Sequence, residues 1–172
     1  MEGQPMNLDN LSKYQDKKQF LDVIRAKTIE TKIKCHGCAQ VIIQTFLDIL
    51  EEDNLQVSMA ASPFTAGLAL TGHNCGAAIG ALMVLGLVYG RRDMNEGMPG
   101  ILKGMWPMRK FVRYFERQYA HLNCRDLTGA DLAVAHQAAD YFEVGGLEKC
   151  AARMADAAAF VAELIYDEGA RP

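Results

Sequence analysis

The sequence predicts an all-α fold, a compact bundle of about five to seven helices. Of the 172 residues, 50% are hydrophobic and only 8% are aromatic. This composition, rich in Ala, Leu, Met and Ile, favours packed helices over a core built from sheets. Apolar residues recur at helical spacing in one segment after another, and Pro and Gly separate these segments. A chain of this length can bury a substantial core.

The N-terminal segment is predicted to be an amphipathic helix. Residues 8–33 are charged and carry apolar side chains at helical spacing, namely Phe20, Leu21, Ile24 and Ile29. Such a pattern suits a helix lying over the core. We therefore predict two regions: residues 1–33 form an N-terminal helical appendage, and residues 34–172 form a helical domain that carries four cysteines for redox or metal chemistry.

The next two helices each begin close to a cysteine. Residues 38–53 form a broad apolar stripe after Gly37, which places Cys38 in the first turn of a helix that faces the core. A short helix over residues 55–61 must stop before Pro63, because the residue before a proline avoids the helical conformation. Asn74 is a good N-cap, so Cys75 is expected to open the following helix.

The helix that begins at Cys75 is unusually rich in glycine. Its glycines form two G-x-x-x-G spacings, at Gly76, Gly80, Gly86 and Gly90. Each glycine lowers helix propensity by up to about 1 kcal/mol, and packing must offset that loss. We interpret the pattern as close approach to a neighbouring helix.

Proline and glycine also divide the C-terminal half. Pro107 is predicted to break any long helix, so that a new helix begins beyond it. Residues 121–129 are predicted to be a loop that carries Cys124, and residues 131–142 a short helix. The last helix, residues 147–166, turns Cys150 inward within its second turn.

Charge and hydropathy limit the possible partners and compartments. The formal net charge of -3 gives no reason to expect nucleic acid as a partner. The first ten residues lack the positive start and apolar stretch of a secretory signal, so we expect a cytoplasmic protein. Residues 54–90 contain no charged side chain, but their uninterrupted apolar part, about 15 residues long, is too short for a membrane span.

The cysteines are the residues to which chemistry can be assigned. Five cysteines in a reducing compartment indicate metal binding or redox work more than a disulfide framework. Cys38, Cys75 and Cys150 fall in the first or second turn of predicted helices. The positive end of a helix lowers the pKa of a thiol, and the thiolate both binds metals and attacks disulfides. We therefore predict that these three and Cys124 form one thiolate site.

Two other patterns keep alternatives open. Cys35 and Cys38 form a C-x-x-C motif, which suits either a redox pair or half of a metal site. No predicted strand leads into it, as a thioredoxin-like unit would require. His73 and His121 each precede a site cysteine by two or three residues, which leaves zinc with mixed Cys/His ligands possible.

Several motifs together resemble a known family. They are residues 37–41 (GCAQV), residues 72–83 (GHNCGAAIGALM), residues 123–127 (NCRDL) and Cys150. The chain resembles the C_GCAxxG_C_C family, whose members have an inferred redox role, over about residues 34–165. The resemblance implies a helical bundle in which the four family cysteines correspond to Cys38, Cys75, Cys124 and Cys150. Cys35 and His36 fall outside that set.

The resemblance also suggests a cofactor. A similar cysteine-bearing domain accompanies an iron-sulfur cluster in split-Soret cytochromes, which implies by analogy that the four cysteines ligate such a cluster. The chain lacks a haem-binding segment, and residues 64–67 are less rich in glycine than is usual for the family. We therefore expect a protein that transfers electrons or senses redox state together with a redox partner protein, more than a substrate-specific enzyme.

Two other functions compete with the cluster. In the first, the protein is a thiol-disulfide oxidoreductase that uses Cys35 and Cys38, or two of the four family cysteines. In the second, the cysteines hold zinc or no metal, and the protein binds partners, with a homodimer formed through the glycine-lined helix.

Overall fold

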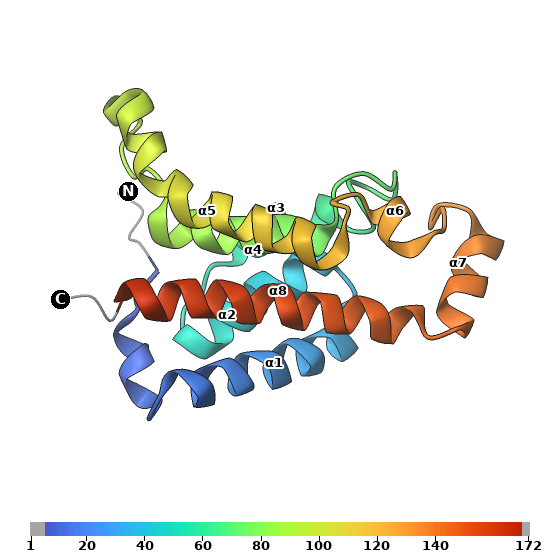
Figure 1. Cartoon of the computed structure of the whole chain (residues 1–172), viewed down its shortest axis with the longest axis horizontal. Helices are drawn as coiled ribbons and strands as arrows, with labels where there is room; N and C mark the ends of the chain where they lie inside the picture. Colours follow the sequence, from blue (N-terminus) through green and yellow to red (C-terminus); the bar gives the residue numbers. More distant parts are fainter. Residues whose placement is uncertain (1–5, 170–172) are drawn as a thin grey trace.

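The computed structural model describes residues 6–169, and that part of the chain is all-α, as predicted (Figure 1). The number of helices is a correction, because the described residues form eight α-helices and the prediction was five to seven. Three short 3-10 helices accompany them: η1 (Asp9–Lys13), η2 (Ser62–Phe64) and η3 (Met94–Glu96). The α-helices are α1 (Lys17–Lys34), α2 (Cys38–Leu50), α3 (Leu55–Ala60), α4 (Gly76–Tyr89), α5 (Gly97–Tyr119), α6 (Cys124–Thr128), α7 (Ala135–Glu143) and α8 (Gly146–Gly169).

The additional helix is α6, which occupies the segment predicted to be a loop. It has five residues, too few to show a helical period in the sequence. It ends at Gly129, whose φ of +69° is the left-handed conformation that suits glycine at a helix C-terminus. Cys124 is therefore the first residue of a helix.

Helix α5 corrects the prediction that Pro107 ends a helix. The helix runs through Pro107, which is buried. One turn earlier, Gly104 lies against the end of α4, where a Cβ would come within 2.3 Å of the carbonyl oxygen of Tyr89. Pro107 removes one hydrogen bond of the helix, and its ring favours a bend there. Figure 1 shows that α5 changes direction along its length and that its first half projects from the bundle.

Helices α1 and α8 pack along their lengths, and α4 lies between α2, α5 and α8. Phe20 and Ile24 of α1 are fully buried. At the surface of the α1–α8 contact, Lys17 pairs with Glu163 at 2.9 Å.

The domain boundary predicted at residue 33 stays a prediction, and the predicted ends at residues 1–5 and 170–172 lie outside the described residues. No helix within residues 6–169 is both long and apolar enough to cross a bilayer.

The glycines at the start of α4 allow it to approach α2, as predicted. A Cβ at Gly80 would lie 2.7 Å from the carbonyl oxygen of Ala39, and one at Gly76 would lie 2.7 Å from the Cβ of Cys38. A Cβ at Gly86 would have no neighbouring atom within 4 Å. The first two glycines therefore serve a contact within the chain.

Candidate redox site

The four cysteines predicted as one site line a single cavity of about 490 Å³. It lies at the end of the bundle where the chain passes through α6 and α7 and enters α8 (Figure 1). Cys38, Cys75, Cys124 and Cys150 all contribute to its wall, whereas Cys35 does not. All five thiols are free in this structure.

Helix starts position three of these thiols. Cys38 is the first residue of α2, and Cys75 is the N-cap of α4. Because Gly76 has no side chain, these two helix starts lie in contact. Cys150 lies in the second turn of α8, as predicted, and points into the same cavity.

A short backbone pairing brings Cys75 and Cys124 together. The N–H of Cys75 donates to the carbonyl of Leu122 at 2.7 Å, and the N–H of Cys124 donates to the carbonyl of His73 at 2.7 Å. These bonds flank an isolated antiparallel bridge between Asn74 and Asn123. The pairing fixes the register of two loops that are far apart in the sequence.

The loop before α4 forms a left-handed turn beside the cavity. Five consecutive residues, 66–70, have positive φ between +49° and +76°, and only Gly67 among them is glycine. A residue with a side chain costs roughly 1–2 kcal/mol in this conformation. At Gly67 a Cβ would also lie 2.8 Å from the Cβ of Cys124. Strained backbone of this kind is typical of functional sites.

Two cations that the sequence analysis missed also line the cavity. Lys32 is only 6% exposed, and its ammonium donates to the carbonyl of His36 at 3.3 Å. Arg153 donates from Nη2 to the carbonyl of Leu127 at 3.2 Å, whereas its buried Nε has no hydrogen-bond partner among the described residues. Neither cation forms an ion pair within residues 6–169. Glu148 lies at the exposed rim.

Cys150 has two polar neighbours. Its Sγ lies 3.5 Å from the hydroxyl of Tyr141 and 4.0 Å from Nη1 of Arg153, which donates to it. Burial and the contact with Cys150 raise the pKa of Tyr141, so its hydroxyl stays protonated and can donate to a thiolate. The three-residue spacing from Cys150 places Arg153 on the same helix face, a signal that was present in the sequence. No comparable signal marked Lys32 or Tyr141.

Burial controls the protonation of three of these thiols. It raises the pKa of Cys75 to about 11, although the backbone N–H groups of Ala77 and Ala78 oppose the increase. Burial and the neighbouring cysteines raise the pKa of Cys124 to about 12, and burial also raises that of Cys38. The backbone N–H groups at the helix starts lower the pKa of Cys38 and Cys75 as predicted, but burial outweighs them, so both pKa values rise. A metal that binds here must displace protons.

The histidines considered as zinc ligands lie elsewhere. His73 and His121 are exposed, and neither lines the cavity. His73 contributes only its backbone, by pairing with Gly67 and Cys124. Within the described residues, no three Cys, His, Asp or Glu side chains are grouped closely enough to hold a metal ion as they stand.

Comparison with known proteins identifies the family. The family model described as "Putative redox-active protein (C_GCAxxG_C_C)" matches residues 36–164. The chain belongs to the C_GCAxxG_C_C family. The resemblance drawn from the cysteine motifs is thereby confirmed, whereas a relation to split-Soret cytochromes stays a prediction. No curated protein and no solved structure gives a significant match to this C_GCAxxG_C_C chain.

The matched region contains most of the cavity wall. All four family cysteines lie inside residues 36–164, as do Tyr141 and Arg153. Cys35 and Lys32 precede the matched region. Lys32 therefore reaches the C_GCAxxG_C_C cavity from α1, the helix that was predicted to belong to an appendage.

Proposed function

We propose that Cys38, Cys75, Cys124 and Cys150 ligate an iron-sulfur cluster, with which the protein transfers electrons or senses redox state. The observation that carries the proposal is that these four thiols line one cavity. Four thiolates are the common ligand set of two-iron and four-iron clusters. When bound, such a cluster supplies one-electron transfer. The residues of the chain would hold the cluster, balance its charge and limit its contact with water.

The charges around the cavity support an anionic occupant. A cation buried without a counter-charge is unfavourable, and the unpartnered Nε of Arg153 adds to that cost. Lys32 and Arg153 together offer two positive charges to a group formed from thiolates. Tyr141 adds a hydroxyl within reach of Cys150. Cations and donors near the ligating sulfurs are among the features that set the potential of a cluster.

The alternatives have weaker support. For zinc, His73 and His121 do not line the cavity, and within the described residues no three Cys, His, Asp or Glu side chains are grouped closely enough to hold a single ion as they stand. For dithiol chemistry, Cys35 lies outside the cavity wall, and the raised pKa of Cys38 leaves little thiolate for attack at neutral pH.

A redox partner protein and a cytoplasmic location complete the proposal. Electrons could enter through the cavity wall that reaches the surface, where Leu70, Phe142 and Leu147 are 47%, 47% and 38% exposed. Exposed apolar side chains at a redox site suit a weak, transient protein contact.

The test is purification without oxygen, followed by a visible spectrum and measurement of iron, acid-labile sulfide and zinc per chain. The proposal predicts broad charge-transfer absorption with iron and sulfide in matching amounts. A colourless, iron-free protein under these conditions would contradict the proposal. Zinc in such a colourless sample would favour the zinc alternative, and a metal-free sample would favour dithiol chemistry.

A further inference from the structure

The projecting half of α5 and the short helix η3 before it carry a row of apolar side chains that stay exposed among the described residues. Met94, Met98, Leu102 and Trp106 recur every four residues and are 76%, 62%, 61% and 49% exposed. Met98, Leu102 and Trp106 therefore lie along one side of α5, and Met94 lies in η3, the short 3-10 helix that precedes it. Gly100, Gly104 and Pro107 of the same helix are buried. We call the four exposed residues the α5 ridge.

The ridge stands away from the body of the molecule. Figure 1 shows the first half of α5 leaving the bundle at the end opposite α6 and α7. The close contact of Gly104 with Tyr89 holds α5 near the point where it leaves. A flat surface could therefore reach the ridge without meeting α7 or the cavity at the other end.

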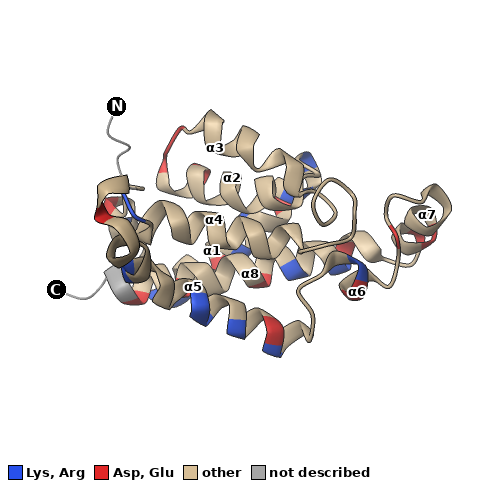
Figure 2. Ribbon diagram, turned by 90° about the horizontal axis from the view of Figure 1, so that it is seen from above, with Lys and Arg blue, Asp and Glu red and all other residues tan. Residues whose placement is uncertain are grey.

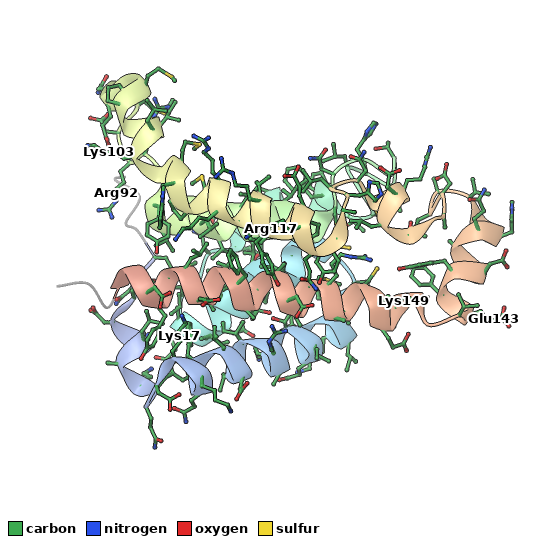
Figure 3. The ribbon with its side chains drawn as sticks, in the orientation of Figure 1. Lys17, Arg92, Lys103, Arg117, Glu143 and Lys149 are labelled. Atoms are coloured by element: carbon green, nitrogen blue, oxygen red, sulfur yellow. The ribbon has the colours of Figure 1, made fainter. Side chains whose placement is uncertain are left out.

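The ridge lies within a basic part of the chain. Residues 91–117 contain seven Lys or Arg against three Asp or Glu, a net charge of +4, whereas all other residues together carry -7. Figure 2 shows Lys and Arg distributed along α5. In Figure 3, Arg92 and Lys103 point outward near the ridge, and Glu143 lies at the far end of the molecule. Arg92, Arg109 and Arg113 have no ion pair within the described residues.

We propose that the α5 ridge and its basic flank, formed by Arg92, Lys103, Arg109 and Arg113, dock the protein on an anionic membrane surface. An amphipathic helix with Trp, Leu and Met on one side and Lys or Arg beside them suits the boundary between lipid headgroups and acyl chains. Trp106 is suited to that depth, and Lys110 holds its ammonium 3.6 Å from the centre of the Trp106 ring. The basic flank attracts anionic headgroups.

A second copy of the chain fits this surface less well. A two-fold contact between ridges would place two segments of net charge +4 side by side, and their repulsion would oppose the pairing. Anionic lipid neutralises the same charges. The proposal does not depend on the redox site, because the ridge and the cavity lie at opposite ends of the bundle.

Trp106 makes the test direct, because it is the only tryptophan in the chain. The full chain is titrated with vesicles of phosphatidylcholine alone and with vesicles that also contain phosphatidylglycerol. Both Trp106 emission and co-flotation of the protein are measured. We expect a blue shift and co-flotation with the anionic vesicles, both weakened by salt, and neither with the neutral vesicles.

Variants separate the ridge from its charges. Met98→Ser with Leu102→Ser should abolish co-flotation, and circular dichroism should be unchanged because both side chains are exposed. Arg92→Gln and Arg109→Gln should each weaken partitioning about fivefold, since a basic residue near an anionic surface contributes about 1 kcal/mol. Lys149→Gln, on the exposed start of α8 far from the ridge, is the matched control and should leave partitioning unchanged.

Three outcomes would overturn the proposal. The first is anionic vesicles that leave Trp106 emission unchanged, and the second is equal binding to neutral vesicles. The third is a blue shift that appears without lipid as protein concentration rises, with a matching dimer mass, which would assign the ridge to a second copy.

Discussion

Arg153 connects the thiol cavity to its surroundings through three contacts. Its guanidinium donates to Leu127 and to Cys150, and it lies 5.4 Å from the centre of the Tyr119 ring. Of these residues, only Cys150 was predicted to have a function. Spacing along α8 could have added Arg153, but Lys32 reaches the cavity through a tertiary arrangement that sequence periodicity does not reveal.

Replacing Arg153 tests whether it balances the charge of a bound cluster. In the cluster-loaded protein, Arg153→Gln should lower the reduction potential by on the order of 50 mV, because the lost cation stabilised the more negative, reduced state by about 1 kcal/mol. Protein-film voltammetry gives the potential. Lys149→Gln, on the exposed part of the same helix, should cause little change, and an equal shift in both variants would contradict a specific role for Arg153.

Protonation of Cys75 predicts how stability depends on pH. Its pKa rises from an ordinary value near 9 to about 11 in the folded protein, so folding favours the neutral thiol. The resulting stability is complete below pH 9 and is lost as pH rises through 11. Urea denaturation of reduced, metal-free protein should therefore show the wild type losing about 1 kcal/mol relative to Cys75→Ala between pH 8 and pH 10.

A variant with no titratable change serves as the control for this experiment. The stability difference between the wild type and Gly86→Ala should be the same at both pH values. If the difference between the wild type and Cys75→Ala is also constant, Cys75 is not held as a neutral thiol. The sequence indicated a lowered pKa for Cys75, because residues 74–76 show that a helix begins there. The sequence does not show the burial of Cys75, whose effect on the pKa outweighs that of the helix start.

At the scale of elements, the contact between α2 and α4 holds two site cysteines side by side. Gly80→Ala should destabilise the protein by about 2–3 kcal/mol, because the new Cβ would lie 2.7 Å from the Ala39 carbonyl. Gly86→Ala adds the same methyl group to the same helix where space is open, and should stabilise it by about 0.5–1 kcal/mol. Thermal melts compare the two variants, and equal effects would contradict the proposed packing.

The left-handed turn at residues 66–70 is the element that the sequence concealed most fully. A run of alanine and leucine gives no indication of positive φ, because only glycine adopts it readily. Helix α6 was predicted to be a loop for a different reason, because its five residues are too few to show a helical period. In both segments tertiary contacts decide the conformation.

Relief of strain in that turn can be measured. Ala69 is exposed and has φ of +53°, so Ala69→Gly should stabilise the protein by about 1 kcal/mol in a urea titration. Ala26→Gly, at an exposed position inside α1, should instead destabilise it by about 0.5–1 kcal/mol. Loss of stability in Ala69→Gly would show that the turn is not left-handed in solution.

At the scale of the whole molecule, the fold collects residues from six helices around one cavity. Cys38, Cys124 and Cys150 come from α2, α6 and α8, and Cys75 is the N-cap of α4. Lys32 comes from α1 and Phe142 from α7. Motif spacing and family resemblance were sufficient to select the four cysteines. They could not predict the two cations of the cavity, the exposed apolar side chains where the cavity wall reaches the surface, or the α5 ridge. These features depend on which helix faces remain uncovered after packing.

The most direct test of the central claim is the iron content per chain of the wild type and of five single Cys→Ser variants, all purified without oxygen. The claim predicts iron in the wild type and in Cys35→Ser, and a large loss in the variants of Cys38, Cys75, Cys124 and Cys150. Iron that is absent from the wild type, or that persists in any of those four variants while Cys35→Ser loses it, would contradict the claim that these four thiols act as one site.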